Sequence, residues 1–135
     1  MDGGEVIEAG VRIIGNVQLG ANVSISAPAE IMAKESAINI GDGCDIAAFV
    51  TITTADSHKR TQGRADNVER RPIWIGSRVF IGTGAVILGG TVIGDESVIG
   101  AGVVLKGQTI PPRSRVRPAA PIIEHGYYAE ERYDA

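Results

Sequence analysis

Residues 71–112 read RPIWIGSRVFIGTGAVILGGTVIGDESVIGAGVVLKGQTIPP, and a large aliphatic side chain returns in this stretch at every sixth position. The series includes Ile75, Ile81, Ile87, Ile93 and Ile99, and a glycine follows most of these residues. A period of six fits neither the 3.6-residue turn of an α-helix nor the alternation of an independent strand. It predicts a parallel β-helix, in which each unit carries one aliphatic side chain inward and then bends sharply at a corner.

The same period extends through the rest of the chain. Further aliphatic positions in phase are Ile7, Ile13, Leu19, Ile25, Ile31, Ile40, Ile46, Ile52 and Leu105. A second series of small or β-branched residues follows four positions later, at Val11, Val17, Val23, Ala29, Cys44, Val50, Val79, Ala85, Thr91, Ser97, Val103 and Thr109. We expect both series to point inward and to stack as ladders about 4.8 Å apart from coil to coil. Cys44 is therefore expected to be a buried small side chain.

Two segments interrupt the period. Residues 54–72 are polar and charged, so we expect a loop over about 55–72 that protrudes from the coils and marks the working face. A nine-residue unit over 31–39 is a second, smaller irregularity. The expected organisation is a single all-β domain over 1–135, with coils at about 7–54 and 73–110 and a C-terminal segment at 111–135.

Composition restricts the possible functions. The chain of 135 residues has a net charge of -3 and a pI near 5.3, which gives no electrostatic basis for binding nucleic acid or an anionic membrane. A single cysteine excludes an intramolecular disulfide. The sequence contains no apolar run of the roughly 18 residues needed to span a bilayer, and its N-terminus does not read as a signal peptide. A cytoplasmic setting is the expectation.

The stretch 71–112 strongly resembles the hexapeptide-repeat acyltransferases, particularly the sugar acetyltransferases. The resemblance implies a left-handed coil and a homotrimer with active sites in the clefts between subunits. It also implies acetyl-CoA as the acyl donor and no required metal. The acceptor would be a hydroxyl or amine of a sugar or nucleotide-sugar.

The resemblance also implies a catalytic histidine in or just before the interrupting loop, where His58 is the candidate. An imidazole suits this role because its pKa normally lies near neutrality, as deprotonating an attacking hydroxyl or amine requires. Asp56, two residues earlier, is expected either to orient the imidazole or to contact the acceptor.

Five further residues are candidates for binding the coenzyme. By match to the family motif, the backbone at Thr83 and Ala101 would meet the pantetheine arm. Lys106, with Arg113 or Arg117, corresponds to basic residues that meet the phosphates of the coenzyme.

Two other functions remain open. A γ-type carbonic anhydrase uses a similar coil but needs three histidines for zinc, and this sequence has only His58 and His125. A solenoid could also have kept the fold as a scaffold or binding protein without catalysis.

Overall fold

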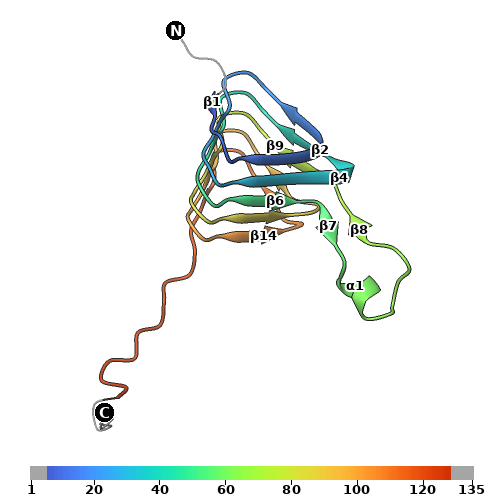
Figure 1. Ribbon diagram of the computed structural model, residues 1–135. Helices are drawn as coiled ribbons and strands as arrows, with labels where there is room; N and C mark the ends of the chain where they lie inside the picture. Colours follow the sequence, from blue (N-terminus) through green and yellow to red (C-terminus); the bar gives the residue numbers. More distant parts are fainter. Residues whose placement is uncertain (1–5, 129–135) are drawn as a thin grey trace.

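The computed structural model describes residues 6–128 and consists of short parallel strands wound into a triangular coil (Figure 1). The coil is left-handed, and nearly all of its regular structure is β. The expected fold class is therefore confirmed. Successive coils stack in parallel register, so residues far apart in sequence lie one above the other.

Each coil contributes to three faces. Face 1 contains β1 (Val6–Ile7), β3 (Ser24–Ile25), β5 (Asp45–Ile46), β10 (Phe80–Ile81), β13 (Val98–Ile99) and β16 (Arg115–Val116). The long strands β2 (Arg12–Leu19) and β4 (Glu30–Ile40) continue around the corner from face 2 to face 3. Face 2 adds β6 (Thr51–Thr53), β11 (Val86–Leu88) and β14 (Val104–Lys106), and face 3 adds β9 (Ile73–Ile75), β12 (Val92–Ile93) and β15 (Thr109–Ile110).

The predicted aliphatic ladders form the core. On face 2, Ile31, Ile52, Ile87 and Leu105 pair in register from coil to coil, and all four are buried. Equivalent ladders run along faces 1 and 3. Cys44 is buried as expected, and burial raises the pKa of its thiol. The hydrophobic effect of these stacked side chains is the main source of the coil's stability.

Three of the predicted inward positions are exposed. Ile7 and Ile13 keep the expected register with Ile25 and Ile31, but they lie in the first coil of the described residues. Thr109 is exposed because it pairs with the outward-facing Val92, one residue out of the expected phase. The coil that follows β13 is shorter than its neighbours, since Val98 pairs with Arg115. Arg115 belongs to β16, so the coil continues beyond its expected end near residue 110.

The predicted loop protrudes from the corner between faces 2 and 3, and we call residues 55–70 the arm (Figure 1). Two short strands, β7 (Ala55–Asp56) and β8 (Glu69–Arg70), pair antiparallel at its base. Between them lies α1 (His58–Thr61), a single helical turn that the sequence had not predicted. The nine-residue unit creates a bulge of residues 34–36 at the same corner, because the register between β2 and β4 skips these three residues.

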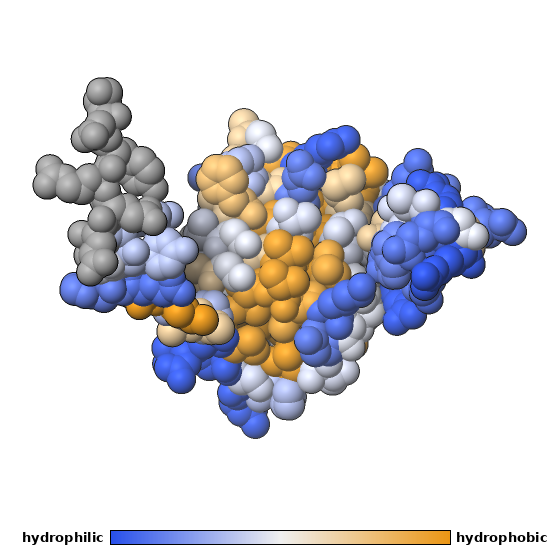
Figure 2. Space-filling view, turned by 90° about the horizontal axis from the view of Figure 1, so that it is seen from below, coloured by the Kyte–Doolittle hydropathy of each residue, from blue (hydrophilic) through white to orange (hydrophobic). Residues whose placement is uncertain are grey.

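The C-terminal segment leaves the last coil and extends away from it (Figure 1). Viewed from that end of the coil, apolar atoms occupy the centre and the polar arm projects to one side (Figure 2). Residues 129–135 of the expected segment, including Tyr133, lie outside the described residues. Within residues 6–128, no helix has the length and apolar character needed to cross a membrane.

Candidate active site

The base of the arm is fixed to the coil by main-chain contacts. The Arg71 N–H donates a hydrogen bond of 3.1 Å to the carbonyl oxygen of Thr54, which closes the β7–β8 ribbon where it leaves the coil. Gly89 of the next coil lies directly against this junction. A Cβ atom at Gly89 would stand 2.7 Å from the Thr54 carbonyl oxygen, closer than real Cβ atoms approach, so only glycine fits without a shift.

Asp56 and His58 form a hydrogen-bonded pair at the start of the arm. The Asp56 Oδ1 atom accepts a hydrogen bond of 3.0 Å from the His58 backbone N–H and lies 2.5 Å from His58 Nδ1. An imidazole that keeps its proton on Nδ1 for this bond leaves Nε2 as a proton acceptor. The histidine side chain is 53% exposed, so it remains open to a ligand.

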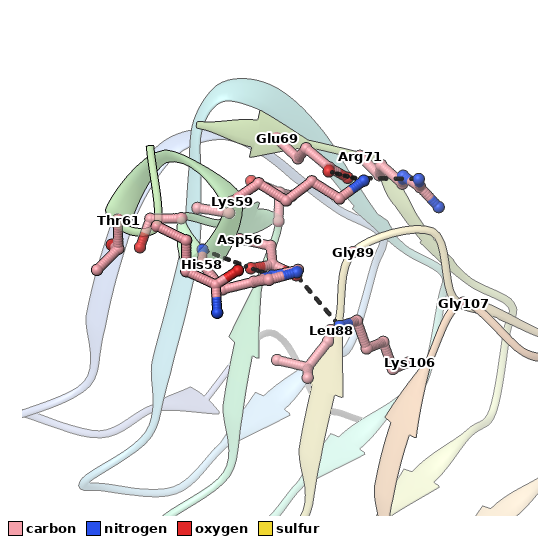
Figure 3. Close-up of a pocket in the computed structure, with 14 residues that line it drawn as sticks. Asp56, His58, Lys59, Thr61, Glu69, Arg71, Leu88, Gly89, Lys106 and Gly107 are labelled. Carbon is pink, nitrogen blue, oxygen red and sulfur yellow. Dashed lines mark hydrogen bonds and ion pairs between the residues drawn. The ribbon is translucent and has the colours of Figure 1, made fainter. Parts of the chain in front are cut away.

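Lys106 joins the same pair from the last strand of face 2. Its Nζ atom lies 3.1 Å from Asp56 Oδ2, the carboxylate oxygen that His58 does not use (Figure 3). The backbone N–H of His58, then its side chain, and then Lys106 lower the pKa of Asp56 well below its ordinary value. Asp56 is therefore an anion throughout the neutral range.

A second ionic group crosses the arm beside this pair. Glu69 accepts from Lys59 at 2.9 Å and from Arg71 at 3.4 Å. Lys59 is the main reason that the pKa of Glu69 is lowered. These partly exposed pairs contribute little to stability, but they set the charge of the surface around His58.

An open cavity of about 1040 Å³ lies between the arm and the coil. It is lined by Asp56, His58, Lys59, Glu69 and Arg71 of the arm and its base, together with Thr54, Ala55, Ser57, Thr61, Gln62, Leu88, Gly89, Lys106 and Gly107. Figure 3 shows the labelled side chains from both parts around this space. The cavity thus combines a histidine–carboxylate pair with three cationic side chains.

The bulge supports the arm from the opposite side. The Arg70 guanidinium donates a hydrogen bond of 3.0 Å to the Lys34 carbonyl oxygen and lies 3.3 Å from Glu35 Oε2. The arm and the bulge, which are the two interruptions of the six-residue period, therefore contact each other.

The seven residues singled out from the sequence lie at different corners. Asp56, His58 and Lys106 come together in the cavity. Thr83 and Ala101 stack at the corner that follows face 1, where the Gly102 N–H donates to the Thr83 carbonyl oxygen.

The two arginine candidates lie away from the cavity. Arg117 follows β16 at the same corner as Ala101, near Gly100. Arg113 lies at the corner between faces 3 and 1, where its N–H donates to the Asp95 carbonyl oxygen. Both side chains are exposed.

Sequence reasoning missed Lys59 and Glu69 as lining residues and did not place Arg71 at the cavity. Their charges were visible in the loop, but only the antiparallel pairing of β7 with β8 brings Glu69 beside Asp56. The pairing signal in two-residue strands is too short to detect from sequence.

A family model described as bacterial transferase hexapeptide (six repeats) matches residues 72–107. Residues 72–107 therefore carry the hexapeptide repeats that define this family. It is 35% identical over 98 residues to galactoside O-acetyltransferase of Escherichia coli, which covers 72% of this chain and 47% of that protein. It is also 36% identical over 92 residues to the carboxysome assembly protein CcmM of a Nostoc species, covering 66% of this chain and 16% of that protein.

Solved structures of the family share the fold. A galactoside acetyltransferase in complex with coenzyme A matches this hexapeptide-repeat chain with a TM-score of 0.64 and 28% identity, over 96% of this chain and 69% of the other. The chain spans less than half the length of the curated relatives that it matches.

Proposed function

We propose that this chain is an acetyltransferase that moves an acetyl group from acetyl-CoA to a hydroxyl or amine of a sugar or nucleotide-sugar. The observation that carries the proposal is the His58–Asp56 pair at the edge of an open cavity, with Nδ1 of the imidazole held by a carboxylate at 2.5 Å. Similarity to acetyltransferases supports the reaction class.

His58 acts as the general base. Its Nε2 atom takes the proton from the acceptor hydroxyl or amine as that group attacks the thioester carbonyl carbon. The same proton then passes to the sulfur of the departing coenzyme thiolate, so no acyl-enzyme forms. Asp56 holds the imidazole in the required tautomer and stabilises its charged form while the proton resides there.

The cavity suits the acyl donor. Its volume lies just above the range of roughly 300–1,000 Å³ that is typical of ligand pockets. Lys59 and Arg71 offer donors for anionic oxygens, which acetyl-CoA carries on its phosphates. The proposed contacts with the coenzyme also include four residues outside this cavity, namely Thr83, Ala101, Arg113 and Arg117.

We also propose a homotrimer with this site at the cleft between subunits. On face 3, Trp74 is 56% exposed and pairs with the exposed Val92; on face 1, Phe80 and Val98 are likewise exposed. Association of coils would remove these apolar side chains from water. Light scattering at micromolar concentration tests this proposal, and a monomeric mass would reject it.

Thiol release from acetyl-CoA tests the transferase proposal, with a panel of sugars and amino sugars as acceptors. Replacing His58 with alanine should lower the rate by about 10²–10⁴-fold, the usual contribution of a general base. His125→Ala is the matched control, because this histidine lies exposed in the C-terminal segment. Undiminished activity in His58→Ala would reject the assignment of the base.

The match to a carboxysome assembly protein favours a second candidate, a non-catalytic scaffold. The two functions differ in ligand binding. Calorimetric titration with coenzyme A distinguishes them, because a scaffold would take up no coenzyme.

A further inference from the structure

Lys106 contacts the proposed catalytic pair from a remote part of the chain. It ends β14, whose residues pair with β11, which in turn pairs with β6 at the root of the arm. Lys106 therefore starts two strand spacings, or about 10 Å, from the strand that leads into Asp56. Leu88 of β11 pairs with Lys106 on one side and with Thr53 on the other, and it lies beside Lys106 in the close-up (Figure 3).

The contacts of the Asp56 carboxylate are divided between two partners. Oδ1 receives both the backbone N–H and the ring nitrogen of His58, whereas Oδ2 receives only the Lys106 ammonium at 3.1 Å. A carboxylate bound through one oxygen alone can turn about its terminal torsion, which is broad and roughly two-fold. With Lys106 on the second oxygen, the plane of the carboxylate is fixed from both sides.

We propose that Lys106 is a positioning residue, which holds the Asp56 carboxylate so that the His58 imidazole keeps its orientation and tautomer. This inference rests on the proposed function of His58 as the base. Lys106 itself then touches neither the acceptor nor the reacting carbonyl.

The charges around Asp56 support this assignment. Glu69, on the paired strand β8, is the nearest competing carboxylate, and it is already bonded to Lys59 and Arg71. Lys106 therefore pairs with Asp56 and not with Glu69. The ion pair also joins the arm to the coil, because its two members belong to these separate parts.

The resemblance to the acyltransferases implies a different role for Lys106, contact with a phosphate of the coenzyme. The two roles separate in steady-state kinetics. A residue that binds coenzyme equally in the ground and transition states affects KM for acetyl-CoA. A residue that positions the base affects kcat.

Lys106→Met removes the ammonium but keeps an unbranched side chain. We expect kcat to fall by about 10- to 100-fold, the scale of a misplaced catalytic group, with KM for acetyl-CoA essentially unchanged. Lys106→Arg should restore part of the rate, since it can also bind a carboxylate. Lys34→Met is the matched control, because this exposed lysine lies on the bulge and not in the cavity.

A second measurement needs no activity. Nitrogen NMR of the two imidazole rings reports which ring nitrogen carries the proton at alkaline pH, where an imidazole is neutral. His58→Ala assigns the signals, and His125 serves as the internal reference. We expect one His58 tautomer with the proton on Nδ1 in the native chain and a mixture of tautomers in Lys106→Met.

Unchanged His58 ring signals in Lys106→Met would overturn the inference, as would a raised KM for acetyl-CoA with unchanged kcat. A native chain without transferase activity would instead defeat the proposed function. The ring signals would still show whether Lys106 orients the pair.

Discussion

Replacing Ile87 with alanine tests how far the stacked ladders stabilise the coil. Ile87 is fully buried on face 2, in register with Ile52 on one side and Leu105 on the other. The substitution removes three carbon atoms, worth about 2.4 kcal/mol at about 0.8 kcal/mol per methylene. Because hydrogen-bonded strands hold the neighbouring coils apart, the hole cannot collapse, and the cavity brings the expected loss of unfolding free energy to about 3–5 kcal/mol.

Urea unfolding followed by circular dichroism measures this loss. Native and variant chains are compared at one protein concentration, since assembly would make stability depend on concentration. Ile122→Ala is the control: its side chain is 91% exposed in the C-terminal segment, so we expect a change within about 0.5 kcal/mol. A loss below about 1 kcal/mol for Ile87→Ala would refute the rigid-ladder argument, because relaxation of the coils would then have filled the hole.

Three further changes test the arm. Gly89→Ala should cost about 1–3 kcal/mol and slow acetyl transfer, because its Cβ would press on the Thr54 carbonyl oxygen; full activity would contradict the close packing. Arg70→Gln should change the free energy of unfolding by less than about 1 kcal/mol. It should nevertheless speed tryptic cleavage within the arm, because the ion pair between Arg70 and Glu35 of the bulge is lost. An unaltered cleavage rate would contradict this. Because the pKa of Asp56 is lowered on folding, its contribution to stability is present above about pH 4 and is lost as pH falls toward its depressed value. The carbon NMR signal of the Asp56 carboxyl group should therefore keep its anionic position until strong acid is reached, and a change near pH 4 would contradict this.

The core was predictable from sequence because one rule repeats in every coil. A large aliphatic at every sixth position faces the core and is buried wherever a coil lies on both sides, and stacking places Ile31, Ile52 and Ile87 in one ladder. The rule failed at Thr109 because a single-residue deletion in the last coil changes the face of each later residue without changing local composition.

The site was predictable only in part. His58 and Asp56 are two residues apart in a conspicuous interruption, so their proximity follows from the sequence alone. Lys106 was expected to meet the coenzyme, and its contact with Asp56 was not foreseen, because that contact depends on the register of three successive strands and on the direction in which the arm leaves the coil. The roles of all these residues in transfer stay predictions.

The location of both irregularities explains how a repetitive fold can hold a specific site. An uninterrupted coil presents the same shallow corner at every level, with no concave space to enclose a ligand. Here the arm leaves one corner while the bulge of residues 34–36 braces it from the coil above through Arg70, and Lys106 reaches it from two coils below. Since the stacked coils fix the height of each contact, the orientation of His58 depends on residues before and after the arm. Alterations in the regular coils that shift either contact should therefore act on the site even when they lie far from His58 in sequence.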